Sequence, residues 1–380
     1  AMSQKSSEMK AQGIDVINMS VGEPDFMTPD HVKEAGKKAI DDNFSKYSPV
    51  PGYPVLREAI VKKLKQENHL EYAVSEIVVG TGGKQGVCNA ILALVNPGDE
   101  VIIPAPYWVS YPQMVKLAGG VPVIVSAGIE QDFKITAEQL EHAITPKTKM
   151  IILCSPSNPT GSVYSAEELE SLAKVVLAHD DLFVLSDEIY EHINYIGGHC
   201  SIASCQGMKE RTILCNGVSK AYAMTGWRLG WIAAPEWIAK GINKLQGQYT
   251  SGTCSVSQMA AVAAYEADQA CVADYREAFR RRRDLIVELA KDIPGLEVNV
   301  PQGAFYLFPK CSSYFGKTDG KHVIRSSSDL AMYILEEGGV ATVGGDAFGA
   351  PECFRMSYAT SDDNIKEALH RIKEVLSKLK

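Results

Sequence analysis

Short apolar runs alternate with longer amphipathic stretches between about residue 77 and residue 234. The runs have the length and β-branched composition of strands, and the stretches between them have the length and apolar spacing of helices. Proline and glycine mark the boundaries, as at Asn96-Pro97-Gly98. This alternation predicts a mostly parallel sheet with helices on both faces. The expected strands are Ile77–Gly80, Glu100–Pro104, Val121–Ser126, Lys149–Cys154, Leu182–Ser186, Thr212–Asn216 and Leu229–Ala234.

A different pattern follows this region. Tyr275–Lys291 carries apolar residues at helical spacing around a charged run, which predicts a long connecting helix. Asp362–Lys380 predicts a closing amphipathic helix with Ser361 as its N-cap. Short strands are expected between these helices, at Gly303–Pro309, Gly339–Val343 and Phe354–Tyr358.

The chain length favours two domains over one. With 380 residues, of which 46% are hydrophobic, the chain can bury a substantial core. We expect a large α/β domain over residues 25–285 and a smaller α+β domain formed by residues 1–24 and 286–380. The cleft between the two is the expected ligand site.

Charge and cysteine content exclude several classes of function. Lys and Arg total 38 against 46 Asp and Glu, and this net charge of -8 argues against a nucleic-acid partner, which requires a basic surface.

The apolar runs are far shorter than the roughly 20 residues that cross a bilayer, so we expect no membrane span. The first ten residues do not resemble a secretory signal. Nine scattered cysteines without a CxxC pair predict reduced, mostly buried thiols, no metal site and a cytoplasmic protein.

Four segments with candidate chemistry lie beside expected strands, at the sheet edge where open α/β folds bind ligands. One of them, Asn216–Trp231, contains Lys220 and Arg228. A lysine in a partly dry pocket loses its proton easily and can form an imine, and an arginine can bind phosphate with its planar fork. An ordinary pair of surface cations would have the same spacing.

Two further segments favour ligand contacts through amide groups. Ser155–Gly161 places Asn158 at this edge, although Asn-Pro and Thr-Gly pairs are also common in turns. Gly80–Gln85 opens an expected helix, whose backbone N–H groups could bind a phosphate. The segment matches neither the dinucleotide fingerprint nor a P-loop.

The last segment, Ser186–Glu191, places Asp187 and Tyr190 at the same edge. A carboxylate there can keep a heterocyclic nitrogen protonated, and a phenol can donate to an oxyanion, although an aspartate can equally cap a turn. Together the four segments offer a nucleophilic lysine, two phosphate binders, a pyridine-nitrogen partner and a phenolate partner. Pyridoxal phosphate requires these groups.

A series of ordered motifs extends over nearly the whole chain. They are SVGEPDF at Ser20–Phe26, KYSPVPGYPVLREAI at Lys46–Ile60, PYWVSYP at Pro106–Pro112, SPSNPTG, SDEIYEH, SKAYAMTGWRLGW and FRMSYAT at Phe354–Thr360. The chain resembles the fold type I, class I and II aminotransferases, in particular the branch with many bacterial aspartate aminotransferases. The resemblance implies pyridoxal 5'-phosphate as cofactor, which cycles through its pyridoxamine form as an amino group moves from L-aspartate to 2-oxoglutarate. It also implies a homodimer with active sites built at the interface.

The resemblance implies roles around the cofactor ring. Lys220 would carry the cofactor as an imine and move the substrate α-proton, and Asp187 would pair with the pyridinium nitrogen. Tyr190 and Asn158 would hydrogen-bond the ring oxygen, and Trp108 would stack on the ring.

It also implies phosphate contacts from Arg228, from the backbone of Gly83 and Lys84, and from Tyr47 of the neighbouring subunit. Many relatives have a serine where this chain has Gly217, so one phosphate contact is either lost or supplied by Ser219.

For the substrate, Arg355 would clamp the α-carboxylate, and Gly22 would let the N-terminal segment close over it. Trp108 and Asn158 would line the same site, and Lys84 would contact the distal carboxylate of aspartate. The chain begins within the expected first helix, so a truncated N-terminus is also an expectation.

Other activities of the fold stay open at this point. Prephenate offers a second carboxylate like aspartate, so prephenate or aromatic amination is the main alternative, followed by alanine transamination. A carbon–sulfur lyase would release pyruvate and ammonia without an amino acceptor. The cofactor-binding module of a transcription regulator is disfavoured, because no DNA-binding domain is expected before Gly22.

Overall fold

The computed structural model describes residues 2–380, with side chains from residue 4 onward. The strands are β1 Ile17–Asn18, β2 Ile77–Gly80, β3 Glu100–Ala105, β4 Val121–Ser126, β5 Thr148–Cys154, β6 Phe183–Asp187, β7 Thr212–Gly217, β8 Gly230–Ala233, β9 Tyr306–Leu307, β10 Val340–Ala341, β11 Val343–Gly344 and β12 Phe354–Ser357. The α-helices are α1 Met2–Ala11, α2 Asp30–Asp41, α3 Pro54–Glu67, α4 Gly83–Leu94, α5 Tyr111–Leu117, α6 Ala137–Ala143, α7 Ala166–Leu177, α8 Glu236–Tyr249, α9 Ser255–Glu266, α10 Ala270–Lys291, α11 Ser327–Gly338 and α12 Asp362–Leu376.

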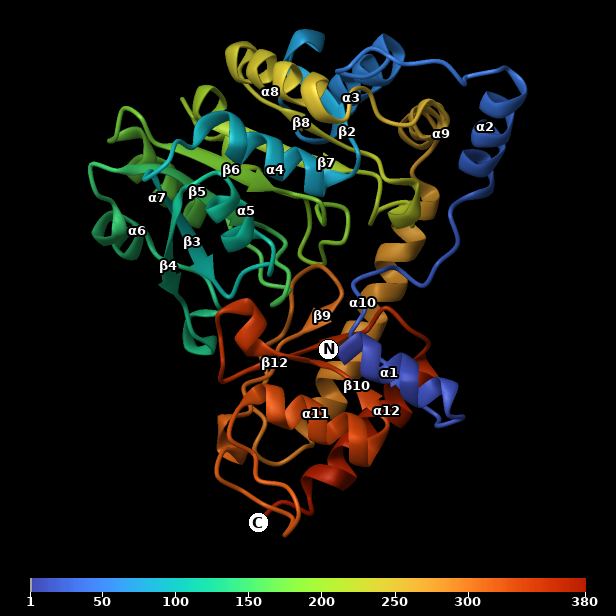
Figure 1. Ribbon diagram of the computed structural model, residues 1–380, viewed down its shortest axis with the longest axis vertical. Coiled ribbons are helices and arrows are strands. Elements are labelled where there is room, and N and C mark those ends of the chain that lie inside the picture. The colour runs from blue at the N-terminus through green and yellow to red at the C-terminus, as the bar shows by residue number, and fades with distance from the viewer. Residues whose placement is uncertain (1) are drawn as a thin grey trace.

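The central sheet has the strand order β2-β8-β7-β6-β5-β3-β4. Its strands run parallel except β8, which is antiparallel to both of its neighbours, so the predicted mostly parallel sheet is confirmed. Successive residues pack into cores on opposite faces: Ile102 belongs to one core, whereas Val101 and Ile103 belong to another. Burial on both faces explains why these strands are continuous apolar runs. Helices α4, α5 and α8 contribute to one face, and α3, α6, α7 and α9 contribute to the other (Figure 1).

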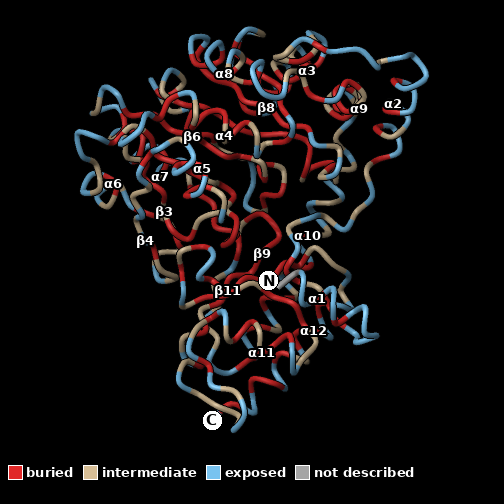
Figure 2. The backbone as a smooth tube through the Cα atoms, viewed as in Figure 1, coloured by how far each residue is buried: buried red, intermediate tan, exposed pale blue. Residues whose placement is uncertain are grey.

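A second core lies below the sheet in Figure 1 and is built from α10, α11, α12 and short strands. Helix α10 runs from the sheet region into this unit. Strand β1 pairs with β10 in parallel, so the N-terminal segment joins the C-terminal residues as expected. Figure 2 shows buried backbone in both regions, in the sheet and around β9, α11 and α12. The exact division of the chain into two domains stays a prediction.

Several predicted boundaries in this second unit are wrong. The strand expected over Gly303–Pro309 is reduced to Tyr306–Leu307, because the N–H groups of Gln302 and Gly303 donate to Gly161 O instead of a strand partner. The strand expected over Gly339–Val343 divides into β10, which pairs with β1, and β11, which pairs with β12. The long helix begins five residues earlier than expected, and the closing helix ends at Leu376 with Ser361 as its observed N-cap.

All nine cysteines are free thiols, but only three are buried, so the expectation that most are buried is wrong. Cys254, for example, is exposed at the N-cap of α9. Among residues 2–380, no helix combines the length and apolar character needed to cross a membrane.

Candidate active site

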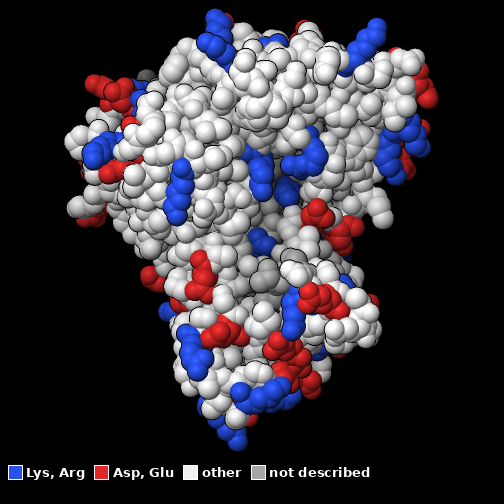
Figure 3. All heavy atoms as spheres, in the orientation of Figure 1, with Lys and Arg blue, Asp and Glu red and all other residues white. Residues whose placement is uncertain are grey.

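A cavity of about 620 Å³ opens beside the carboxyl ends of the central strands, and both regions of the chain line it. Figure 3 shows Lys and Arg atoms gathered in a hollow in the middle of one face. The predicted site residues that line the cavity are Gly22, Gly83, Lys84, Trp108, Asn158, Asp187, Tyr190, Ser219, Lys220, Arg228 and Arg355. Tyr47 does not line it and is 97% exposed.

Lys220 lies three residues after the end of β7, and its Nζ donates to the carbonyl of Gly22 at 2.6 Å. Desolvation lowers the pKa of Lys220 to about 8. The positive charges of Arg355 and Arg228 act in the same direction, and the charge of Glu23 opposes them. About a tenth of Lys220 is therefore the neutral, nucleophilic amine at pH 7, far more than for a lysine with an ordinary pKa.

Asp187 ends β6 as a buried carboxylate without a cation. It accepts hydrogen bonds from Tyr111 Oη at 2.7 Å and from the N–H of Ile189 at 3.3 Å. Of the residues described, none forms an ion pair with it, and burial raises its pKa. A protonated heterocyclic nitrogen would supply the missing positive charge.

Arg355 is a buried arginine on β12 whose hydrogen bonds are incomplete. Its Nη1 donates to Asn158 Oδ1 at 2.8 Å and its Nη2 to Ser20 O at 2.7 Å, whereas its Nε has no partner. The guanidinium lies over the ring of Tyr306, 4.5 Å from the centroid. A buried donor without an acceptor is costly, so this arginine is suited to an anionic ligand such as a carboxylate.

Two tyrosines form a hydrogen-bonded pair in the cavity wall. Tyr190 Oη and Tyr306 Oη are 2.7 Å apart, and burial raises the pKa of both phenols. Both phenols therefore stay protonated and can donate a hydrogen bond to an anionic oxygen.

The N-terminus of α4 has the geometry of a phosphate site. Gly82 is its N-cap, has φ +80°, and leaves the helix without a side-chain cap. A Cβ on Gly82 would lie 2.5 Å from Arg228 Nη2, so glycine permits the close approach of the guanidinium. Backbone N–H groups at the start of a helix together with an arginine bind phosphate well.

The pairing of strands β7 and β8 explains why position 217 is glycine and not serine. Strands β7 and β8 pair Gly217 with Gly230, and a Cβ on Gly217 would lie 2.7 Å from the Gly230 Cα. A serine at this position would therefore require the strands to shift. Ser219 is buried and lines the cavity, which places a hydroxyl two residues further along.

Lys84 and Trp108 form another part of the wall. Lys84 Nζ lies 4.9 Å from the Trp108 ring centroid, and Trp108 packs edge-on against Tyr111. The lysine thus adds a positive charge to the cavity wall, besides those of Arg228, Arg355 and the protonated form of Lys220.

Sequence reasoning missed several wall residues, among them the aromatic residues Tyr111, Tyr306 and Phe348. Tyr111 follows β3 within the PYWVSYP motif, where its own spacing after a strand was a usable signal. Tyr306 lies in an apolar run that is typical of a buried core, so the sequence did not indicate a role for its hydroxyl group.

Comparisons with known proteins agree with this geometry. The family model described as aminotransferase class I and II matches residues 14–372. The aspartate/prephenate aminotransferase of Cereibacter sphaeroides is 49% identical, over 98% of this chain and 94% of that protein.

Solved structures also resemble this chain over nearly its whole length. The crystal structure of the aspartate aminotransferase from Rhizobium meliloti has a TM-score of 0.97 at 44% identity, and the match covers 100% of this chain and 96% of that one. The Thermus thermophilus aspartate aminotransferase with maleate has a TM-score of 0.92 at 41% identity, covering 98% and 95%. These matches confirm the fold type I architecture, and the chain belongs to the class I and II aminotransferases.

Proposed function

We propose that this aminotransferase binds pyridoxal 5'-phosphate through Lys220 and transfers an amino group from L-aspartate to 2-oxoglutarate. One observation carries the proposal: Lys220, with its lowered pKa, shares a cavity with a buried carboxylate that lacks a cation and with the uncapped N-terminus of α4. A lysine nucleophile, a nitrogen partner and a phosphate site in one cavity fit this cofactor better than a free amino acid alone.

The residues present fit each part of the cofactor. Asp187 would hold the ring nitrogen, and Tyr190 with Asn158 would hydrogen-bond the ring oxygen. Trp108 would pack against the ring. The phosphate would contact the N–H groups of Gly83 and Lys84 and the side chains of Ser219 and Arg228. When bound, the cofactor supplies an electron sink that makes the substrate α-proton acidic.

Binding and proton transfer then depend on the side chains of the chain itself. The unpaired Nε of Arg355 is available for the α-carboxylate that amino-acid and 2-oxo-acid substrates share. Gly22 lies against Tyr306. A Cβ on Gly22 would lie 2.6 Å from the Tyr306 phenol oxygen, so glycine is needed for the N-terminal segment to approach Tyr306 this closely. Lys220, once free, has a pKa near that of a useful general base and can move the α-proton.

Lys84 supports aspartate as the amino donor. Its ammonium group lines the cavity together with Arg355, so a substrate with two carboxylates can meet two cations. Alanine offers only one carboxylate and would leave Lys84 without an anionic partner.

Prephenate is the second candidate. It also carries two carboxylates, and similar proteins include the aspartate/prephenate aminotransferase of Cereibacter sphaeroides. We therefore include it in the test of substrate range.

The proposal includes a homodimer in which the partner's Tyr47 reaches the phosphate site. Tyr47 is 97% exposed, and Met27 and Ile40 are also largely exposed, at 79% and 64%. A second cavity beside Arg228 is open to receive a side chain and is lined by Thr81, Ala223, Gly226, Trp227, Arg228, Gly252, Thr253, Cys254 and Ser257. Sedimentation velocity should give the mass of two chains, and a monomer that is fully active would contradict this part.

The substrate proposal is tested by steady-state rates with purified protein and added cofactor. Aspartate with 2-oxoglutarate should produce oxaloacetate and glutamate, at a kcat/KM about tenfold or more above that of alanine. Prephenate, with glutamate or aspartate as donor, is measured in parallel. Aspartate turnover below that of alanine would overturn the donor assignment, and release of pyruvate and ammonia without an acceptor would indicate a lyase.

A further inference from the structure

The loop after β6 has two sides with different surroundings. Asp187 and Tyr190 line the cavity, whereas Glu188 and Glu191 do not. Glu191 is buried, with its side chain 4% exposed, and it pairs with Lys63 of α3, whose side chain is 2% exposed. A fully buried lysine on a helix is unusual unless its charge is paired.

Every oxygen of the Glu191 carboxylate has a partner. Oε1 accepts from Lys63 Nζ and from Asn216 Nδ2, the latter at 2.8 Å, and Oε2 accepts from Asn68 Nδ2 at 2.8 Å. Lys63 Nζ also donates to Asn68 Oδ1 at 2.7 Å. Such a satisfied buried network holds its members in one arrangement.

Asn216 connects this network to the strand that leads to Lys220. Its Nδ2 donates to Glu191, while its Oδ1 accepts from the N–H of Gly217 at 2.7 Å. Gly217 is the last residue of β7, three positions before Lys220. Glu191 itself follows Tyr190 directly in the sequence. One carboxylate therefore contacts the two segments that carry the phenol and the lysine of the site.

We propose that the buried Lys63–Glu191 pair is a positioning device, which through Asn216 fixes the Tyr190 phenol and the Lys220 amine relative to each other. This inference rests on the proposed function, because it gives these two groups their tasks. Neither Lys63 nor Glu191 contacts the cavity, so both act only through other residues.

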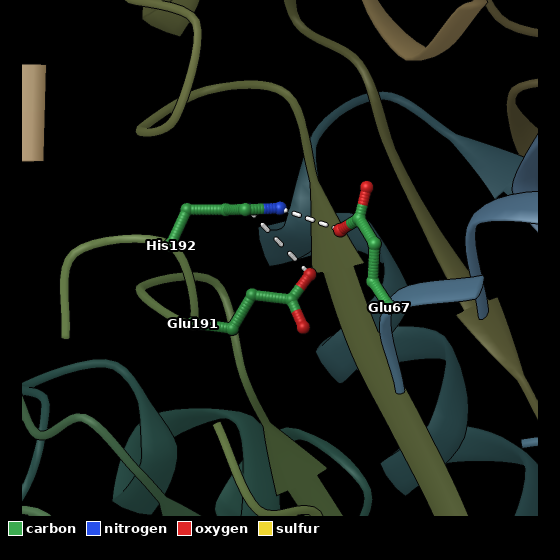
Figure 4. Close-up of side chains that lie close together, drawn as sticks. All are labelled: Glu67, Glu191 and His192. Carbon is green, nitrogen blue, oxygen red and sulfur yellow. Dashed lines mark hydrogen bonds and ion pairs between the residues drawn. The ribbon is translucent and has the colours of Figure 1, made fainter. Parts of the chain in front are cut away.

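A metal site is the competing interpretation of this cluster. Glu67, Glu191 and His192 bring potential ligand atoms within 4.8 Å of one another, and Figure 4 shows their side chains pointing toward a common centre. Lys63 Nζ, however, contacts Glu191 and lies 3.6 Å from Glu67 Oε2. Its ammonium already supplies the positive charge that a metal would bring, and a metal ion beside it would be repelled.

The titratable groups around Glu191 come from several elements. Lys63 and Glu67 belong to α3, and His192 follows Glu191 in the loop. His199 lies later in the chain, with its Nε2 2.7 Å from Glu188 Oε2.

Substitutions at Asn216 and Lys63 test the network without altering any residue of the cavity wall.

Asn216→Ala breaks the connection to β7 and leaves the Lys63–Glu191 pair in place, while Lys63→Met breaks the pair. For both variants we expect kcat to fall about 10- to 100-fold, since small displacements of reacting groups have effects of this size. KM for the amino acid should stay within about twofold. The pH midpoint of the visible band of the cofactor-loaded protein should rise, because a displaced Tyr190 phenol no longer favours the unprotonated form.

A further readout needs no cofactor. Labelling of Lys220 by acetic anhydride, followed by mass spectrometry across pH, should have its midpoint near the pKa of about 8 in the wild type and higher in both variants. Lys65→Met is the matched control, because Lys65 lies on the same helix in an exposed pair with Glu71. It should change none of these readouts.

The outcomes separate the two hypotheses. A wild type without a visible band would contradict the proposed function, and the labelling midpoints would still test the positioning role. If Asn216→Ala keeps the wild-type kcat, band midpoint and labelling midpoint, the network is only structural and the inference is wrong. Asn216→Ala decides the question even if Lys63→Met fails to fold.

Discussion

The two sides of the Ser186–Glu191 segment differ in how their charges are satisfied. On the cavity side, Asp187 is buried without a cation and Arg355 has a buried Nε without an acceptor. On the other side, Glu191 pairs with the Lys63 ammonium and also accepts hydrogen bonds from Asn68 and Asn216. Burial is similar on both sides, so the difference lies in the partners. Incomplete pairing marks the groups that are free to bind ligands, and complete pairing marks the groups that hold them in place.

The pKa shifts of the two carboxylates express this difference. Burial raises the pKa of Asp187. Burial alone would also raise the pKa of Glu191, but Lys63, with His192 and His199, reverses the effect and leaves it well below its usual value. Ionised Asp187 therefore costs stability above its unfolded pKa of 3.8, whereas Glu191 contributes stability above 4.5 that is lost as the pH falls through its depressed folded value.

The largest effect should come from Lys220. Lys220→Ala removes both the nucleophile and the proposed base, so we expect kcat/KM for aspartate to fall by about 10⁴-fold. Steady-state assays at saturating cofactor measure this loss. Lys240→Ala, an exposed lysine on α8 paired with Glu236, is the control and should be fully active. A Lys220→Ala variant with more than a tenth of the wild-type rate would exclude this role.

Asp187→Asn should separate activity from stability. We expect kcat to fall about 10²- to 10³-fold, as for the loss of one preorganised charge in an active site. Because the ionised carboxylate is destabilising where it lies, the cofactor-free variant should be at least as stable as the wild type at pH 7. Urea denaturation and steady-state rates test both statements. A clear loss of stability would show that the hydrogen bonds from Tyr111 and Ile189 already compensate the charge of Asp187.

Glu191→Gln should behave in the opposite way. Removing the charge leaves the buried Lys63 with only its longer contact to Glu67, at 3.6 Å, which we expect to cost about 3 kcal/mol of unfolding free energy at pH 7. The difference from the wild type should begin to shrink as the pH falls below 4.5, because the unfolded wild-type chain then binds a proton at Glu191 while the folded protein keeps this carboxylate ionised. Denaturation curves between pH 7 and pH 4 measure it. A difference that does not depend on pH would mean that the ion pair is not its source.

The smallest effect should come from Lys84, whose side chain is exposed at the cavity wall. Lys84→Met should lower kcat/KM for aspartate about tenfold, the size of one hydrogen bond to a charged group. The rate with alanine should be unchanged. Equal losses for both substrates would assign Lys84 to the cofactor phosphate rather than to the distal carboxylate.

Sequence patterns predicted the sheet well because its strands are buried on both faces and leave unbroken apolar runs. The expected Ile77–Gly80 matches the fully buried β2 at both ends. The short strands of the C-terminal unit were less predictable, since their ends depend on contacts such as those of Gln302 and Gly303 with Gly161. Such hydrogen bonds join segments far apart in the sequence, and local patterns do not contain them.

The predicted site residues meet in one cavity, apart from Tyr47, because motifs after parallel strands converge at one edge. The supporting residues were not predicted. Lys63 occupies a position on α3 between the buried Ile60 and Leu64, so a charged residue on the apolar face was the available signal. Its meaning depended on Glu191, which is 128 residues away.

The most direct test of the account is the absorption spectrum of the purified protein with pyridoxal phosphate, recorded before and after addition of aspartate, with Lys220→Ala in parallel. The account predicts a visible band in the wild type that aspartate removes and that the variant lacks. A wild type without such a band would contradict the central claim that Lys220 holds this cofactor, and a band that aspartate leaves unchanged would contradict aspartate as the donor.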